Sequence, residues 1–328
     1  MGQSLTEAHQ RLYHYTTAAG LQGIVESQQL RATNISYLND VEEHIGFFDR
    51  RFPQLFEGAA RTAIAEIAST PSGRSRVEGL GGAEGAWATI RGLGAVIRDR
   101  TLEFNTPYIT SFCSAPQQAP DDGLLSQWRG YGLDGGYAVV FETQGINQLL
   151  IEEAKRYNYQ TSVWGDVEYY EANTSEKATH PETLEHESNV RKALLKFIPT
   201  FDQSELEALY TPLTVLSCLC KHRGFREESE VRIVAVPVNN QVLEAAKEAG
   251  EKRPRRPVQF TMKDGVLVPY IDLFGHQTNG ELSKLPISSV IVGPHSDRLK
   301  RQRAVELLLE QHEIDAKVIV SEIPYVGR

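Results

Sequence analysis

The chain has 328 residues and a formal net charge of −9, so its composition does not favour a broad electrostatic surface for nucleic acid. Hydrophobic residues make up 41% and charged residues 23%, as in ordinary globular proteins, and no apolar run approaches the roughly 20 residues of a membrane helix. The three cysteines and the polar residues 1–11, which carry no secretory signal, predict a reducing, cytoplasmic location without membrane partners.

The N-terminal segment alternates like a strand over residues 12–15 and stops at Thr16-Thr17, which are good helix N-caps. A short amphipathic helix then runs to about Gln28, and residues 33–38 resume extended character. On such a strand His14 points to the face opposite Tyr13 and Tyr15. His14 is therefore either a core histidine bonded to backbone or a group that faces a ligand.

Two long stretches have helical periodicity, at about 41–105 and 184–224. Residues 69–85, between two helical runs of the first stretch, are rich in Gly and Ser and predict a loop. The second stretch contains Cys218, Cys220 and His222, but no second ligand pair follows at zinc-finger spacing, so we expect no metal site. We interpret both stretches as helical insertions in a single domain spanning residues 1–328.

The middle of the chain predicts a strand over 108–114, a short helix around 124–129 and a buried strand over 137–141. The first strand carries the hydroxyl groups of Thr110 and Ser111. Trp128 and Tyr131 lie three residues apart and share a face of a helical turn. These groups form either a stacking site rimmed by hydrogen-bond donors or an ordinary core.

The segment HRGFREESEVRIVAV, residues 222–236, places Glu228 and Glu230 where an apolar strand begins. A carboxylate fixed at a strand end can be aimed at a ligand hydroxyl or at a developing positive charge. The alternative is that the pair is a solvated strand edge.

The C-terminal third changes to strand periodicity at 257–262, 266–271 and 289–292. A helix over 297–311 and a strand over 317–320 then predict a β-α-β unit at about 286–325. Two basic runs, at 252–256 and 297–303, are either solvated surface or sites for a phosphate-bearing ligand or an RNA strand. The fold class we expect is α+β: a mixed, mostly antiparallel sheet with a cleft, helical insertions and a C-terminal β-α-β unit.

Several separated blocks resemble the domain-of-unknown-function 2971 family of bacterial proteins. In chain order they read YHYTT, SYLND, YITSFCS, LSQWRGYG, GGYAVVFE, FREESEVRI, SVIVGPHSD and IPY. The resemblance runs from about residue 12 to 326, and the blocks occur in the family's order.

The order of blocks is also similar to that of the ADP-ribosyltransferase superfamily, which has a His or Arg strand, a middle Ser-Thr-Ser strand and a late strand that opens on a catalytic Glu. That resemblance implies an ADP-ribosyltransferase-like fold with NAD as the substrate. In it, Glu230 bonds the ribose 2′-hydroxyl and steadies the oxocarbenium-like transition state, while Glu228 orients the acceptor. The implied NAD-binding residues are His14, Tyr15, Thr110, Ser111, Trp128 and Tyr131.

Three functions follow as hypotheses. The first is an NAD-dependent ADP-ribosyltransferase or NAD glycohydrolase, used by analogy in bacterial stress or phage defence, with an unknown protein or nucleic-acid acceptor. The second is a non-catalytic nucleotide- or nucleic-acid-binding sensor, since the third position of the middle motif is Phe112 and not serine. The third is a metal-dependent hydrolase that uses Asp121, Asp122, Glu228 and Glu230.

Overall fold

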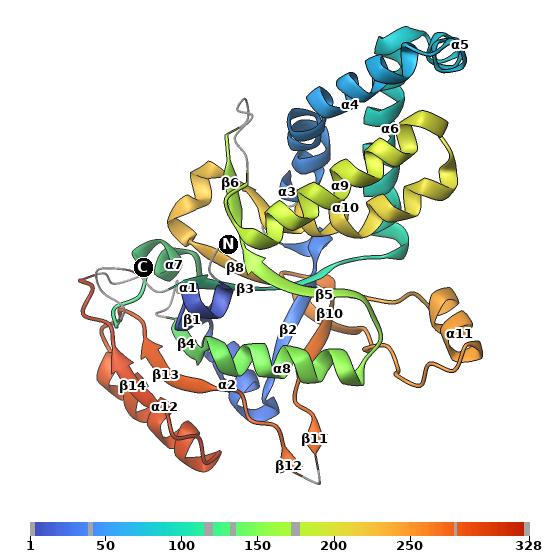
Figure 1. The fold of residues 1–328 in the computed structure, drawn as a ribbon. Helices are drawn as coiled ribbons and strands as arrows, with labels where there is room; N and C mark the ends of the chain where they lie inside the picture. The colour runs from blue at the N-terminus through green and yellow to red at the C-terminus, as the bar shows by residue number, and fades with distance from the viewer. Residues whose placement is uncertain are drawn as a thin grey trace.

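The computed structural model describes residues 4–38, 42–114, 121–131, 136–171, 178–278 and 281–324. Its centre is a ten-stranded sheet with the order β14-β13-β4-β1-β3-β2-β10-β9, to which β8 and β5 are added beside β3 (Figure 1). Within this sheet the pairing of β13 with β14 is parallel and the other pairs are antiparallel. The prediction of a mixed, mostly antiparallel α+β architecture is confirmed.

The predicted strand-helix-strand start is also confirmed. It consists of β1 (Arg11–Thr16), α2 (Ala18–Ser27) and β2 (Gln29–Asn34). The hydroxyl of Thr17 accepts a hydrogen bond from the Gly20 amide, so this residue caps α2 as its type predicts. The extended run expected over residues 33–38 lies instead at Gln29–Asn34. It ends there because the Asn34 side chain caps a turn of 3-10 helix, Ile35–Tyr37.

The strand β3 (Tyr108–Ser114) lies where the sheet divides. On one edge it pairs along its length with β8 (Glu230–Pro237), which continues to β5 (Tyr159–Asp166). On the other edge β2 pairs with its first residues and β1 with its last, so the two strands diverge between them. The three segments with candidate site residues are therefore neighbouring strands, in the order β1, β3, β8.

One side of the sheet carries a helical layer (Figure 1). The two predicted insertions pack against each other in this layer and share a core of buried aromatic and aliphatic side chains, among them Phe52, Phe56 and Leu194. Its elements are α3 (Glu42–Gly46), a π-helical turn (Phe47–Arg51), α4 (Phe52–Ala68), α5 (Pro71–Gly79), α6 (Gly82–Phe104), α9 (Pro181–Thr200) and α10 (Glu207–Leu219).

Two predictions in this layer are wrong. The Gly- and Ser-rich residues 69–85 are not a loop, because Thr70 caps α5, Pro71 occupies its first turn, and Val77 is buried in the layer's core. The second insertion is helical only as far as Leu219. It then forms the short strand β7 (Cys220–His222) and a 3-10 turn, Arg223–Glu228.

The larger core lies toward the opposite side of the sheet, where α2, α8 (Thr143–Arg156) and α12 (Arg298–Gln311) pack (Figure 1). The predicted β-α-β unit is present, because β13 (Ile287–Val292) and β14 (Lys317–Val320) are parallel neighbours joined through α12. The remaining elements are α1 (Leu5–Ala8), α7 (Leu125–Tyr131), β4 (Tyr137–Glu142), β6 (Glu168–Tyr170), α11 (Asn240–Glu248), β9 (Gln259–Lys263), β10 (Val266–Phe274), β11 (Gln277–Thr278) and β12 (Glu281–Leu282).

Candidate functional site

Glu230 is the first residue of β8, and only 5% of its surface is exposed. Arg232 follows two residues later on the same strand, so its side chain lies on the same face of the sheet. It binds both oxygens of the Glu230 carboxylate. Its Nε lies 2.7 Å from Oε1 and its Nη2 lies 2.9 Å from Oε2. Arg232 also donates to the carbonyl of Cys218 at the end of α10, which ties this face of β8 to the helical layer.

Lys221 on β7 joins the two glutamates of the motif. Its Nζ lies 2.8 Å from Glu228 Oε2 and 3.2 Å from Glu230 Oε2. The ammonium also lies 4.6 Å from the ring centroid of Phe225. Glu228 is the more accessible of the two carboxylates, with 26% of its side chain exposed against 6% for Glu230.

The pKa of Glu230 is lowered to about 2. Burial alone would raise it, but the positive charges of Arg232 and Lys221 outweigh burial, and hydrogen bonds from Arg232 and the hydroxyl of Ser111 lower the pKa further. Glu230 is therefore a buried carboxylate that stays ionised at neutral pH.

Glu230, Glu228, Lys221 and Arg232 are called the Glu230 cluster below. Two further groups lie against this cluster. Tyr169 on β6 accepts the backbone N–H of Glu230 at 2.8 Å, and burial raises the pKa of its phenol, so the hydroxyl keeps its proton. Ser111 lies directly opposite Arg232 in the β3–β8 ladder. Of the residues expected to bind a ligand, Ser111 is the one that joins the Glu230 cluster.

His14 lies on the other face of the sheet. The side chains of Tyr13, Cys113 and Glu230 share one face, because Tyr13 pairs with Cys113 and Cys113 pairs with Glu230. His14 follows Tyr13 and points away from that face, with its ring edge against Phe112 at 5.8 Å between centroids. The expectation that His14 and Glu230 face one ligand from a common surface is corrected by this register.

His14 makes the backbone contact expected of a core histidine. Its Nδ1 lies 2.9 Å from the carbonyl oxygen of Ser111, in the gap where β1 and β2 diverge. A carbonyl oxygen only accepts hydrogen bonds, so Nδ1 carries the proton and Nε2 carries the lone pair in the neutral ring. Burial lowers the pKa of His14, and the bond to Ser111 opposes this effect. The link between His14 and Glu230 thus passes through Ser111, which uses its carbonyl for one and its hydroxyl for the other.

Three other residues that were expected to contact a ligand, Thr110, Tyr15 and Trp128, are buried in the core. Thr110 is 2% exposed and donates its hydroxyl hydrogen bond to the carbonyl of Arg31. Tyr15 is buried and accepts the N–H of Leu124.

Trp128 is 1% exposed and is enclosed by its neighbours. Its indole N–H donates to the carbonyl of Asp122, and its ring meets that of Tyr15 edge to face at 4.9 Å. A tryptophan enclosed in this way does not offer a face for stacking. Tyr131 ends α7, and its side chain lies outside what the structure describes.

The metal hypothesis finds no support in the positions of its residues. Asp122 lies in a turn. Its carboxylate accepts a hydrogen bond from the N–H of Glu322 in the C-terminal segment. Among the residues that the structure describes, no group of three or more His, Cys, Asp or Glu side chains is arranged to hold a metal ion. The described helices also include none that is long and apolar enough to span a membrane.

Residues 127–233, about a third of the chain, match the model of DUF2971, a family of proteins of unknown function. The predicted resemblance to this family is confirmed. The DUF2971 match begins in α7 and ends in β8, so it contains Lys221, Glu228, Glu230 and Arg232. Searches of the curated proteins and of the solved structures found no match.

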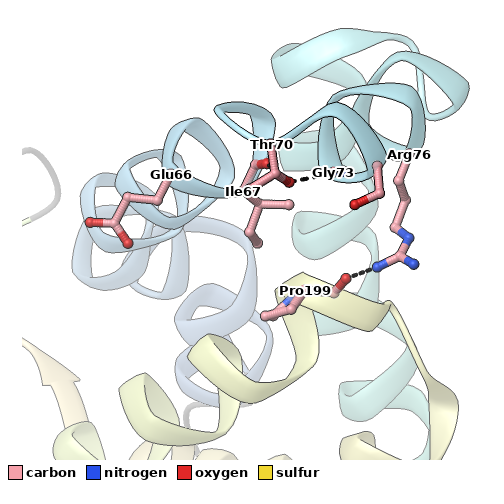
Figure 2. A pocket seen from close by; sticks show the side chains of 7 residues that line it. Glu66, Ile67, Thr70, Gly73, Arg76 and Pro199 are labelled. Carbon is pink, nitrogen blue, oxygen red and sulfur yellow. Dashed lines mark hydrogen bonds between the residues drawn. The ribbon is translucent and has the colours of Figure 1, made fainter.

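Two hollows lie in or beside the helical layer. A cavity of about 380 Å³ adjoins the Glu230 cluster through Tyr169 and is lined by Arg51, Glu168, Tyr169, Glu171, Thr179, Arg223 and Arg226. The other hollow, between α4, α5 and the end of α9, is closed on one side where Arg76 donates to the Pro199 carbonyl (Figure 2). The helices α4 and α5, which carry most of that lining, lie on the side of the helical layer away from β8 (Figure 1), and no residue that lines this hollow contacts Glu228 or Glu230.

Lys221, Arg232 and Tyr169 were not predicted as site residues. Arg232 has a signal in the sequence, because residues two apart on a strand share a face and a buried strand charge needs a partner. Lys221 and Tyr169 have no comparable signal, since the parallel pairing of β6 with β7 that places them together cannot be read from either segment.

Proposed function

We propose that this protein cleaves the bond between nicotinamide and ribose in NAD and passes ADP-ribose to an acceptor or to water. The observation that carries the proposal is the buried carboxylate of Glu230 at the start of β8, held by Arg232 and Lys221 beside the Ser111 strand. The similarity in block order to the ADP-ribosyltransferase superfamily supports it, since β1, β3 and β8 are consecutive neighbours.

The chemistry requires a fixed negative charge next to the ribose. When the bond breaks, its electron pair leaves with nicotinamide and positive charge builds on the sugar, which a nearby carboxylate stabilises. Arg232 fixes the orientation of the Glu230 carboxylate, and Ser111 helps to lower its pKa. A group held in this way loses little freedom when the transition state forms.

The ribose reaches Glu230 by replacing one contact, the hydrogen bond from Lys221 to Glu230. The contact of Lys221 with Glu230, at 3.2 Å, is longer than its contact with Glu228, at 2.8 Å. A ribose 2′-hydroxyl takes the place of the longer contact while Lys221 stays paired with Glu228. The more exposed Glu228 then faces the acceptor and orients its nucleophile.

The test is release of labelled nicotinamide from NAD, with transfer of label from the adenylate half measured in parallel. Ser111→Ala and Glu228→Gln keep the Arg232–Glu230 pair, so they test the site without leaving a buried charge alone. Each substitution is expected to lower the rate by about a hundredfold. Glu103→Gln, at an exposed position of α6, is the matched control. Rates in the two site variants equal to wild type reject the proposal.

A second candidate is a nucleotide-binding module without turnover. It is favoured by the saturation of Glu230, whose oxygens accept hydrogen bonds from Arg232 and Lys221. In that case calorimetry detects saturable binding of NAD, while no nicotinamide is released.

A further inference from the structure

The cavity beside Tyr169 is formed where the helical layer meets the two-stranded sheet of β6 and β7. The π-helical turn contributes Arg51, the strand β6 contributes Glu168 and Tyr169, and the 3-10 turn after β7 contributes Arg223 and Arg226. Its lining thus combines segments that are more than a hundred residues apart in the chain.

Its two carboxylates are already engaged. Glu168 accepts the backbone N–H groups of Thr179 at 2.8 Å and His180 at 3.2 Å, directly before α9, where the helix dipole favours a negative charge. Glu171 forms an ion pair with Arg223. Glu171 thus offsets the charge of Arg223, while Glu168 keeps its negative charge at the start of α9; the lining holds a third guanidinium that forms an ion pair with neither of them.

Arg226 is that third guanidinium. It is exposed, and its side chain forms no ion pair or hydrogen bond with the part of the chain that the structure describes. Arg51 is buried, and its guanidinium lies 5.4 Å from the ring centroid of Tyr170. The lining thus holds three guanidinium groups and two carboxylates, and Glu187 also interacts with Arg51.

Tyr169 adds a neutral donor to this lining. Its oxygen accepts the N–H of Glu230, so its own O–H proton remains for another acceptor. Arginine forks and hydroxyl groups are the donors that bind phosphate oxygens in proteins.

We propose that this cavity binds the phosphate groups of a nucleotide, with Arg223 and Arg226 as the charged contacts and Tyr169 as a hydroxyl donor. The ligand's next groups then extend past Tyr169 toward Glu228 and Glu230. This inference stands without the proposed cleavage, because it concerns phosphate recognition alone.

The experiment is isothermal titration calorimetry with two probes, inorganic pyrophosphate and ADP-ribose, neither of which contains the bond cleaved in NAD. Wild-type protein is expected to bind both saturably, with ADP-ribose the tighter. Arg226→Gln is expected to weaken both by about tenfold, because the variant loses a charged hydrogen-bond donor to the phosphate oxygens. Arg91→Gln removes the same charge at an exposed position of α6 and serves as the control.

A second measurement uses wild-type protein only, so it does not depend on how a variant folds. The affinity for pyrophosphate is expected to fall as salt is raised, because salt screens exposed charges. Failure of pyrophosphate to bind, or equal affinities in Arg226→Gln and Arg91→Gln, overturns the inference. Binding of both probes without nicotinamide release from NAD keeps the phosphate site and rejects only the cleavage.

Discussion

Arg232 binds the carboxylate of Glu230 through two nitrogens, from a position two residues later on the same strand. Both side chains are buried, with 4% and 6% of their side-chain surfaces exposed. Because side chains alternate along a strand, both members of the pair lie on one face of β8. This arrangement keeps a negative charge inside the protein at neutral pH.

Removing either member of that pair is expected to be costly. Glu230→Gln and Arg232→Met each leave a buried charge without its main partner, so each is expected to lower the free energy of unfolding by about 3–5 kcal/mol. The double variant is expected to lose less than the sum of the two. Urea denaturation of all four proteins measures these values, and strictly additive losses would show that the pair is not coupled.

A second buried ion pair, between Glu153 and Arg256, makes the stability of the fold depend on pH in the acid range. Glu153 in α8 is fully buried and accepts hydrogen bonds from Arg256 at 2.6 and 2.7 Å. Burial raises its pKa, but Arg256 and His276 outweigh burial and bring the pKa down to about 2. Since the folded pKa is below the ordinary value of 4.5, this contribution is complete above pH 4.5 and is lost as pH falls toward 2.

Glu153→Gln is therefore expected to lower stability by about 3–5 kcal/mol at pH 7, and by less at pH 3. Glu152→Gln, at the neighbouring exposed position, is expected to change stability by less than about 0.5 kcal/mol. Urea denaturation at the two pH values tests both expectations. A deficit in Glu153→Gln that is the same at pH 3 and pH 7 would contradict the assigned pKa.

The burial of His44 predicts a second dependence of stability on pH, at milder pH than that of Glu153. The ring is buried against Phe48 in the helical layer, and burial, then the charge of Arg98, lowers its pKa to about 4. Between about pH 6.5 and 4 the unfolded chain binds a proton that the folded protein does not, so stability falls as pH falls through this window. His44→Leu is expected to flatten the fall, measured by thermal denaturation from pH 7 to pH 4. His312→Leu, after α12, is the control, and an equal effect in both variants would contradict the assignment.

A substitution at Trp128 tests whether this side chain packs in the core or stacks on a ligand. The ring is enclosed by Tyr15, Gly123 and Gly293, where a Cβ added to either glycine would lie within 3.0 Å of indole atoms. Trp128→Ala is expected to lower the free energy of unfolding by about 3–5 kcal/mol. Unchanged stability with weakened NAD binding would instead restore the stacking role that the sequence suggested.

Local signals predicted much of the fold. Thr17 marked the start of α2, alternation located β1 and β3, and apolar runs located β4 and β8. The loop prediction at residues 69–85 was wrong because glycine and serine content gave no information on the packing that stabilises α5 against the helical layer.

The site was predicted less completely, for a physical reason. Residue types identify groups able to do chemistry, but burial decides which of them a ligand can reach. Thr110, Tyr15 and Trp128 have suitable side chains, yet each is bonded within the core. The opposite orientations of His14 and Glu230 depend on the register between β1, β3 and β8, which no single segment specifies.

The most direct test of the central proposal compares nicotinamide release from labelled NAD by wild-type protein, Ser111→Ala and Glu103→Gln. We expect release by wild type and Glu103→Gln, and a rate about a hundredfold lower in a folded Ser111→Ala protein, because Ser111 helps to lower the pKa of the Glu230 carboxylate. Absence of nicotinamide release from wild-type protein, or equal rates in all three, would contradict the account.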